Sequence, residues 1–157
     1  MTYRIERVGA GNTALMHGLL TMFGEAFEDV ATFGDKRPSP EYLDELLAGP
    51  SFVALAALKG DDVVGGLAAY ELRKFEQQRS EFYIYDLAVS AAHRREGIAT
   101  ALIHAVSAIA KQRGAYVTFV QADLVDAPAI ALYTKLGIRE DVLHFDIPVD
   151  GKPRASV

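Results

Sequence analysis

The sequence contains no cysteine. Disulfide bonds, thiolate metal ligands and a cysteine nucleophile are therefore excluded, and the composition fits a reducing, cytoplasmic location. No apolar run approaches the roughly 20 uncharged residues that a membrane-spanning helix needs. The opening residues MTYRIERV carry alternating charges, unlike the apolar segment of a secretory signal. We therefore expect no membrane partner and no secretion.

The chain also lacks an excess of basic residues, because its net charge is −5. Residues 25–62 hold 9 acidic and 3 basic side chains, residues 121–150 hold 6 and 2, and residues 70–120 hold 5 and 7. A nucleic-acid-binding protein is expected to show a basic face, so nucleic acid is not an expected partner. This division favours a cationic partner and an anionic ligand near the middle of the chain. A normally solvated surface is the alternative.

What is present is the composition of a globular protein, with 157 residues, 50% of them hydrophobic and 24% charged. We expect one domain over residues 1–150 and a loose tail over residues 151–157. Periodicity and turn residues predict the strands and helices of an α/β protein with a mixed sheet, with an acidic loop over 25–39. The predicted strands cover residues 2–8, 52–58, 63–72, 82–89, 115–122 and 142–147, and the predicted helices cover residues 12–23, 40–48, 97–113 and 126–136.

One strand-turn-helix segment carries most of the chemical information. It reads YIYDLAV at 83–89 and RREGIAT at 94–100. The first N–H groups of a helix have no partner within it and lie at the positive end of its dipole, which makes a natural phosphate site. Gly97 and Ala99 let phosphate oxygens approach the backbone, and two arginines add positive charge. An ordinary turn with solvated arginines is the alternative.

Two motifs resemble those of the GCN5-related N-acetyltransferases (GNAT). Arg94-x-x-Gly97-x-Ala99 matches the family signature [Gln/Arg]-x-x-Gly-x-[Gly/Ala], and the DxxAxxxYxKxG pattern at 126–137 resembles the motif of its later helix. The chain is more narrowly similar to the small aminoglycoside 3-N-acetyltransferases that modify gentamicin. The segments that carry this likeness are YDLAV at 85–89, GAYV at 114–117, VQAD at 120–123, ALYTKLG at 131–137 and HFDI at 144–147.

The resemblance implies the GNAT acyl-CoA N-acyltransferase fold, whose central sheet splays open and is flanked by about four helices. The opening is expected between the strands at 82–89 and 115–122. Acetyl-CoA is the implied cosubstrate, with its pantetheine arm paired to the backbone near Leu87, Ala88 and Val89. The other cofactor contacts that the resemblance implies are Arg94, Arg95, Glu96, Gly97, Ile98, Ala99, Thr100, Asp126, Ala129 and Tyr133.

The sequence departs from the family pattern at two places. Asp126 stands where the family has Asn; it is still a good helix cap, but its ionised carboxylate cannot donate a hydrogen bond to the cofactor arm. Ile138 follows Gly137 in place of Phe, and the stretch left for a final strand is short. The acceptor site is therefore expected to be open, or completed by a partner chain in a homodimer.

The resemblance places Tyr133 at the cofactor sulfur, as the acid that protonates the leaving thiolate; a tyrosine that packs on the sheet is the alternative. The acidic candidates for the general base are Glu81, Asp86, Asp123 and Asp146, and a water relay is a further alternative. Asp86 and Asp123 lie on the two strands that are expected to flank the acceptor amine. Strand alternation puts Tyr83 and Tyr85 on the face opposite Asp86, unless a β-bulge redirects it.

A cationic amine is the expected acceptor. Glu28 and Asp29 belong to the acidic loop, which covers the acceptor in this family, and carboxylates there attract ammonium groups over about 8 Å. No metal is expected, because the histidines form no ligand pair with a third ligand. The residues expected to contact the acceptor are Glu28, Asp29, Glu81, Tyr83, Tyr85, Asp123, His144 and Asp146.

The sequence is therefore interpreted as an enzyme that acetylates an aminoglycoside antibiotic directly from acetyl-CoA, at the 3-amino group, and so confers resistance. Two alternatives are kept. One is a GNAT enzyme that acts on a polyamine, a small amine or a peptide. The other is a coenzyme-A-binding sensor without useful catalysis.

Overall fold

The computed structural model describes residues 2–152. The chain forms two compact units, Met1–Gln121 and Ala122–Val157, and each is described by itself. Most of the tail expected over 151–157 lies outside the described residues. The first unit contains β1 Arg4–Arg7, α1 Thr13–Ala26, the π-helix η1 Ala31–Asp35, α2 Pro40–Ala48, β2 Phe52–Lys59, β3 Asp62–Arg73, β4 Ser80–Val89, the 3₁₀ helix η2 Ala91–His93, α3 Ile98–Gln112 and β5 Ala115–Val120, and the second contains α4 Ala127–Leu136.

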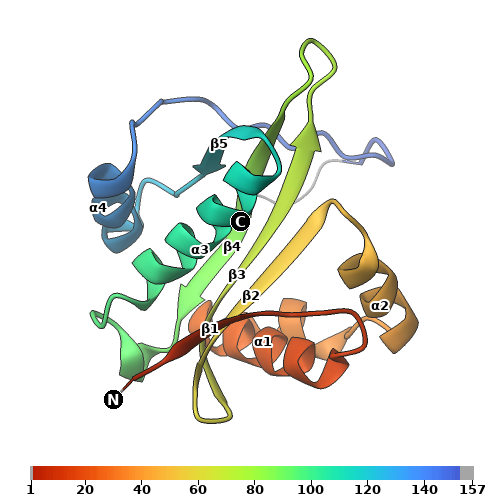
Figure 1. Ribbon diagram of the computed structural model, residues 1–157, viewed down its shortest axis with the longest axis vertical. Coiled ribbons are helices and arrows are strands. Elements are labelled where there is room, and N and C mark those ends of the chain that lie inside the picture. Colours follow the sequence, from red (N-terminus) through yellow and green to blue (C-terminus); the bar gives the residue numbers. More distant parts are fainter. Residues whose placement is uncertain (1, 153–157) are drawn as a thin grey trace. The chain divides into compact units, whose positions relative to one another are not determined.

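The first unit is built on a five-stranded mixed sheet in the order β1-β2-β3-β4-β5. Neighbouring strands run antiparallel, except that β4 and β5 are parallel. The helices α1 and α2 cover one face of this sheet, and α3 covers the other (Figure 1). The predicted mixed-sheet α/β fold is therefore confirmed. None of the helices within residues 2–152 has the length and hydropathy needed to cross a membrane.

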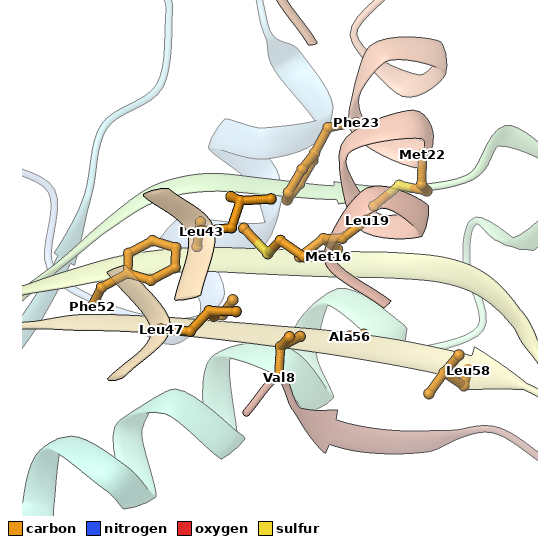
Figure 2. Packing of buried hydrophobic residues seen from close by; sticks show 12 residues of the cluster. Val8, Met16, Leu19, Met22, Phe23, Leu43, Leu47, Phe52, Ala56 and Leu58 are labelled. Carbon is orange, nitrogen blue, oxygen red and sulfur yellow. The ribbon is translucent and has the colours of Figure 1, made fainter. Parts of the chain in front are cut away.

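The face under α1 and α2 holds one hydrophobic core. Alternate residues of β2, from Phe52 to Leu58, point to this face and meet Met16, Leu19 and Leu43 (Figure 2). The residues between them in β2 point to the opposite face, where α3 covers the sheet with Ile98, Leu102 and Val106 among its buried side chains. Because β2 is buried on both faces, its sequence is apolar from Phe52 to Leu58 and shows no alternation.

Local capping signals set where the helices begin. The Asn12 side chain accepts a hydrogen bond from the Leu15 N–H at 3.2 Å, as predicted. Ser39 caps α2 in the same way, one residue before Pro40. The helix α3 begins after Gly97, whose φ of +80° is a conformation that glycine adopts most readily. Gly97 has no side chain to cap the helix, so the first N–H groups of α3 stay uncovered.

The acidic segment expected as a loop over 25–39 is more ordered than predicted. Glu25 and Ala26 belong to α1, and η1 follows. The Arg37 guanidinium holds the segment against α1, because it donates to the Phe33 carbonyl at 2.9 Å and to the Thr21 hydroxyl at 2.7 Å. This long-range arginine cannot be read from local periodicity.

The strand expected over 142–147 is not formed in the described part of the second unit. A strand needs a hydrogen-bonding neighbour, and α4 is the only regular element described in this unit. The prediction of a final strand is therefore wrong for the unit taken by itself. Local alternation alone cannot supply the missing neighbour.

We expect Gly66→Ala to destabilise the protein. A β-carbon at Gly66 would lie 2.0 Å from Cδ1 of Leu19, and Leu19 is fully buried, so it cannot move aside freely. Such overpacking costs about 1–3 kcal/mol and lowers Tm by several degrees. Thermal unfolding followed by circular dichroism measures it. Gly9→Ala is the control, because its β-carbon would meet nothing within 4 Å, and equal melting of both variants would contradict the packing argument.

Candidate active site

The sheet of the first unit opens between β4 and β5. Pairing of these parallel strands begins at Ser80 and ends at Ile84, opposite Val120. β4 continues to Val89, where it still pairs with β3. Over residues 85–89, the edge of β4 that faces β5 therefore pairs with no strand of this unit within residues 2–121. The opening predicted between these strands is present.

A β-bulge lies where the opening begins. Ile84 is opposite Ala69 and Asp86 is opposite Ala68, so Tyr85 is an extra residue in β4. An extra residue reverses the side on which all following side chains point. Asp86 therefore shares a face with Tyr83, and simple alternation, which put it on the opposite face, is wrong here. The bulge that the sequence analysis allowed as an exception is present.

Aromatic rings surround this position on the same face of the sheet. Tyr83 stacks on Phe119 with ring centroids 4.6 Å apart, and its hydroxyl donates to the Gln121 side chain at 2.8 Å. The centroid of the Tyr85 ring lies 5.2 Å from that of Tyr83 and 6.0 Å from that of Tyr70. These rings lie on the face of the sheet that carries Asp86.

Burial in this setting raises the pKa of the Asp86 carboxyl above its ordinary value. The pKa of the Tyr70 phenol is also raised, first by burial and then by the negative charge of Asp86. Among residues 2–121 of the first unit, no basic side chain lies within 4.0 Å of the Asp86 carboxylate. A partly buried carboxylate with a raised pKa and no cation is suited to accept a proton.

The start of α3 forms the expected cradle for an anion. The first bond of the helix runs from the Ala101 N–H to the Gly97 carbonyl, so the earlier N–H groups have no acceptor within the helix. Arg95 and Gly97 both have positive φ, and a β-carbon at Gly97 would meet only the Tyr3 hydroxyl, at 3.9 Å. The backbone is therefore open to a close approach by phosphate.

The side chains around the cradle have different roles. Arg94 is exposed and donates weakly to the Val89 carbonyl, at 3.4 Å, and Arg95 is also exposed. Glu96 forms an ion pair with the nearly buried Lys59 at 2.7 Å, and this hydrogen bond lowers the Glu96 pKa. Glu96 thus fixes the turn with its side chain, and only its backbone N–H is suited to an anion. The buried side chain of Ile98 likewise leaves only its N–H.

Three of the acidic residues expected at the acceptor lie in the first unit. Glu28 is exposed, so its carboxylate is accessible to a cation. Asp29 accepts from the Thr32 N–H at 3.1 Å and so stabilises η1. Glu81 accepts from the Tyr116 hydroxyl and lies 3.9 Å from the Lys74 ammonium. Glu28 is therefore the most accessible of the three carboxylates to a cationic acceptor.

Ala99 and Thr100, also predicted as cofactor contacts, lie in the first turn of α3. The other predicted residues lie in the second unit. Asp126 caps α4 by accepting from the Ala129 N–H at 3.2 Å, and Tyr133 lies one turn further along the helix. The Tyr133 pKa is raised by burial and then by Asp126. His144 and Asp146 are exposed and bonded to each other at 2.9 Å. Their roles, and that of Asp123, stay predictions.

Three residues near Tyr83 and Tyr85 were not predicted as site residues from the sequence: Tyr70, Phe119 and Gln121. Tyr70 is directly opposite Tyr83 in the pairing of β3 with β4, and Phe119 is opposite Tyr83 in β5. The hairpin turn before β3 and the alternation of each strand were visible in the sequence. The register in which the strands pair cannot be read from the sequence, so these residues could not be placed around Tyr83.

Comparison with known proteins identifies the fold family. Residues 16–138 match the acetyltransferase (GNAT) family. The chain belongs to the GNAT family. A crystal structure of an aminoglycoside acetyltransferase from an uncultured soil metagenomic sample is 58% identical, with a TM-score of 0.93, and the match covers 95% of this chain and 99% of that one. The resemblance inferred from the sequence motifs is thus confirmed.

Two further relatives are more distant. A second aminoglycoside acetyltransferase from an uncultured soil metagenomic sample, solved in complex with sisomicin, is 32% identical with a TM-score of 0.86, covering 94% of this chain and 96% of that one. N-acetyltransferase 8B of Rattus norvegicus is 29% identical over 57% of this chain and 40% of its own length. The match thus spans two fifths of the length of that rat protein.

Proposed function

We propose that the chain transfers the acetyl group of acetyl-CoA directly to an amine of an aminoglycoside, at the 3-amino group. The observation that carries the proposal is the Asp86 carboxylate, which the bulge places among tyrosines beside the unpaired edge of β4. One GNAT domain over residues 1–150 performs the reaction in the cytoplasm. The 58% identity to an aminoglycoside acetyltransferase supports the substrate class, and resistance to such antibiotics is the proposed role.

The residues of the first unit fit acetyl-CoA, which GNAT enzymes generally use. Its phosphates need N–H donors, positive charge and a backbone without an obstructing side chain, and the start of α3 provides these with Arg94, Arg95 and Gly97. Its pantetheine amides need a free strand edge, and Leu87 to Val89 provide one. When bound, acetyl-CoA supplies an acetyl thioester.

Different groups of the chain then accept a proton, stabilise the carbonyl oxygen and donate a proton. Asp86 accepts a proton from the acceptor ammonium, so that the neutral amine attacks the thioester carbonyl carbon. A backbone N–H near Leu87 donates to the carbonyl oxygen as it becomes negative. As the new C–N bond forms and the C–S bond breaks, Tyr133 donates its proton to the leaving sulfur. The acceptor nitrogen releases its second proton to water, from which the Tyr133 phenolate is reprotonated. Holding both reactants in place can remove several kcal/mol of the barrier, about 7–11 at best.

The proposal is tested by thiol release from acetyl-CoA across a panel of amines, with NMR of the products. We expect turnover with gentamicin and sisomicin, with the new acetyl group on the 3-amino nitrogen. Preferred turnover of spermidine would replace the aminoglycoside with a polyamine, which the acidic residues 25–62 also suit. Coenzyme A binding without transfer to any amine would indicate a sensor.

We expect Tyr133→Phe to lower kcat and leave acetyl-CoA binding nearly unchanged. The substitution removes the proton that the leaving sulfur needs and keeps the ring, and loss of such an acid typically costs about 100-fold or more. Steady-state kinetics and calorimetry with coenzyme A measure the two effects. Unchanged kcat in Tyr133→Phe would remove Tyr133 as the acid.

A further inference from the structure

Tyr70 lies within the candidate active site and has no part in the steps above. The centroid of its ring lies 5.2 Å from that of Phe52 and 6.0 Å from that of Tyr85, and the two tyrosine rings are at 87° to each other. The exposed fraction is 36% for Tyr70 and 63% for Tyr85. We call these two perpendicular, solvent-accessible rings the aromatic corner. One ring comes from β3 and the other from the bulge of β4.

The aromatic corner lies beside an uncompensated negative charge. Asp86 is opposite Ala68, which precedes Tyr70 by two residues in β3, so Asp86 and Tyr70 occupy the same face of the sheet. Burial and then the negative charge of Asp86 raise the pKa of the Tyr70 phenol. The pKa of the Tyr83 phenol is raised by burial, then by Tyr85 and then by Asp86. Within residues 2–121, no basic side chain lies within 4.0 Å of the Asp86 carboxylate. A cationic acceptor can therefore supply the positive charge at this position.

We propose that the aromatic corner binds the reacting ammonium group of the acceptor, and that Tyr70 is a specificity-determining residue that recognises the positive charge through its ring. The inference rests on the proposed function and refines its acceptor site. Aromatic faces carry negative charge density and attract ammonium groups, most strongly where water is partly excluded. The corner holds the cation beside Asp86, which then takes its proton. The acetylated product is neutral and loses this interaction.

The test compares Tyr70→Leu, which removes the ring, with Tyr70→Phe, which keeps it. For Tyr70→Leu we expect the KM for gentamicin to rise roughly 10-fold, the change that loss of one partly desolvated cation–π contact produces. The KM for acetyl-CoA stays unchanged. Tyr70→Phe keeps the gentamicin KM close to that of the unaltered chain. Similar losses in both variants would assign recognition to the hydroxyl and overturn the proposal.

A binding measurement separates recognition of charge from a general packing role. Calorimetry with coenzyme A present compares gentamicin with its N-acetylated product. We expect the unaltered chain to bind the product more weakly, and Tyr70→Leu to weaken the binding of gentamicin while leaving that of the product unchanged. Equal weakening of both ligands would show a packing role and overturn the proposal.

Two further variants keep the test decisive. Phe75→Leu removes a fully exposed ring from the loop between β3 and β4 and should leave the gentamicin KM unchanged. Tyr85→Leu removes the other ring of the corner and gives the same expected losses if Tyr70→Leu does not fold. Absence of any aminoglycoside acetylation by the unaltered chain would refute the proposed function. Normal acetylation with an unchanged KM in Tyr70→Leu and Tyr85→Leu would refute the corner alone.

Discussion

Asp86→Asn is expected to reduce kcat/KM for an aminoglycoside roughly 100-fold or more, the usual contribution of a positioned general base. The amide has nearly the shape of the carboxylate but cannot accept the proton of the acceptor ammonium. Acetyl-CoA binding should stay nearly unchanged, because the expected cofactor contacts in the first unit are backbone groups and the arginines near Gly97. Steady-state kinetics with gentamicin, and calorimetry with coenzyme A, measure the two effects.

The pH dependence of kcat/KM provides a second test of Asp86 as the base. Asp86 must be ionised to act as a base, so kcat/KM should fall as the pH drops through its pKa, which burial has raised. In Asp86→Asn this acidic limb should disappear, leaving only the ionisation of the acceptor. An unchanged acidic limb in Asp86→Asn would mean that another group is the base.

The same pKa shift predicts the effect on stability. A carboxyl whose pKa is higher in the folded chain stabilises the fold only while it is protonated, below its unfolded pKa. That contribution is lost as the pH rises through the folded pKa, so ionised Asp86 is unfavourable at neutral pH. We therefore expect Asp86→Asn to melt at the same or a higher temperature at pH 7. Glu76→Gln, at an exposed carboxylate outside the site, is the control and should keep full activity.

Gly97→Val is expected to weaken acetyl-CoA binding roughly 100-fold or more, because hydrogen bonds to a charged group contribute about 1.5–3 kcal/mol each. Gly97 has a φ of +80°, which a β-branched residue rarely adopts, so valine would shift the first N–H groups of α3. Its side chain would also occupy the space that a phosphate needs. Calorimetry with coenzyme A measures the loss directly.

The matched control for Gly97→Val is Gly114→Val, at the opposite end of α3. Gly114 has a φ of +77° and open space around it, so valine there costs a similar backbone strain of about 1–2 kcal/mol. Both variants should melt at lower temperatures, and only Gly97→Val should lose coenzyme binding. Equal coenzyme affinity in the two variants would mean that the start of α3 does not hold the phosphates.

Features set by local chemistry could be predicted from the sequence. Asn12, Ser39 and Asp126 cap helices where the sequence places them, because capping involves only the next few residues. The cradle at Gly97 was predictable for the same reason, since a glycine before an apolar helix leaves its N–H groups open. The opening of the sheet came from the resemblance and is present in the first unit.

Features that depend on pairing between distant segments could not be predicted. Alternation alone turned Asp86 away from Tyr83, and only the register of β4 against β3 shows the bulge that turns it back. Tyr70 was overlooked because its neighbour Tyr85 lies in another strand. The expected strand over 142–147 failed because its alternation says nothing about a partner.

A crystal structure with both coenzyme A and gentamicin bound would show directly whether Asp86 meets the acceptor amine. We expect the diphosphate on the first N–H groups of α3 and the 3-amino nitrogen within hydrogen-bond distance of the Asp86 carboxylate. An aminoglycoside bound away from Asp86, with its amines turned from the β4 edge, would contradict it.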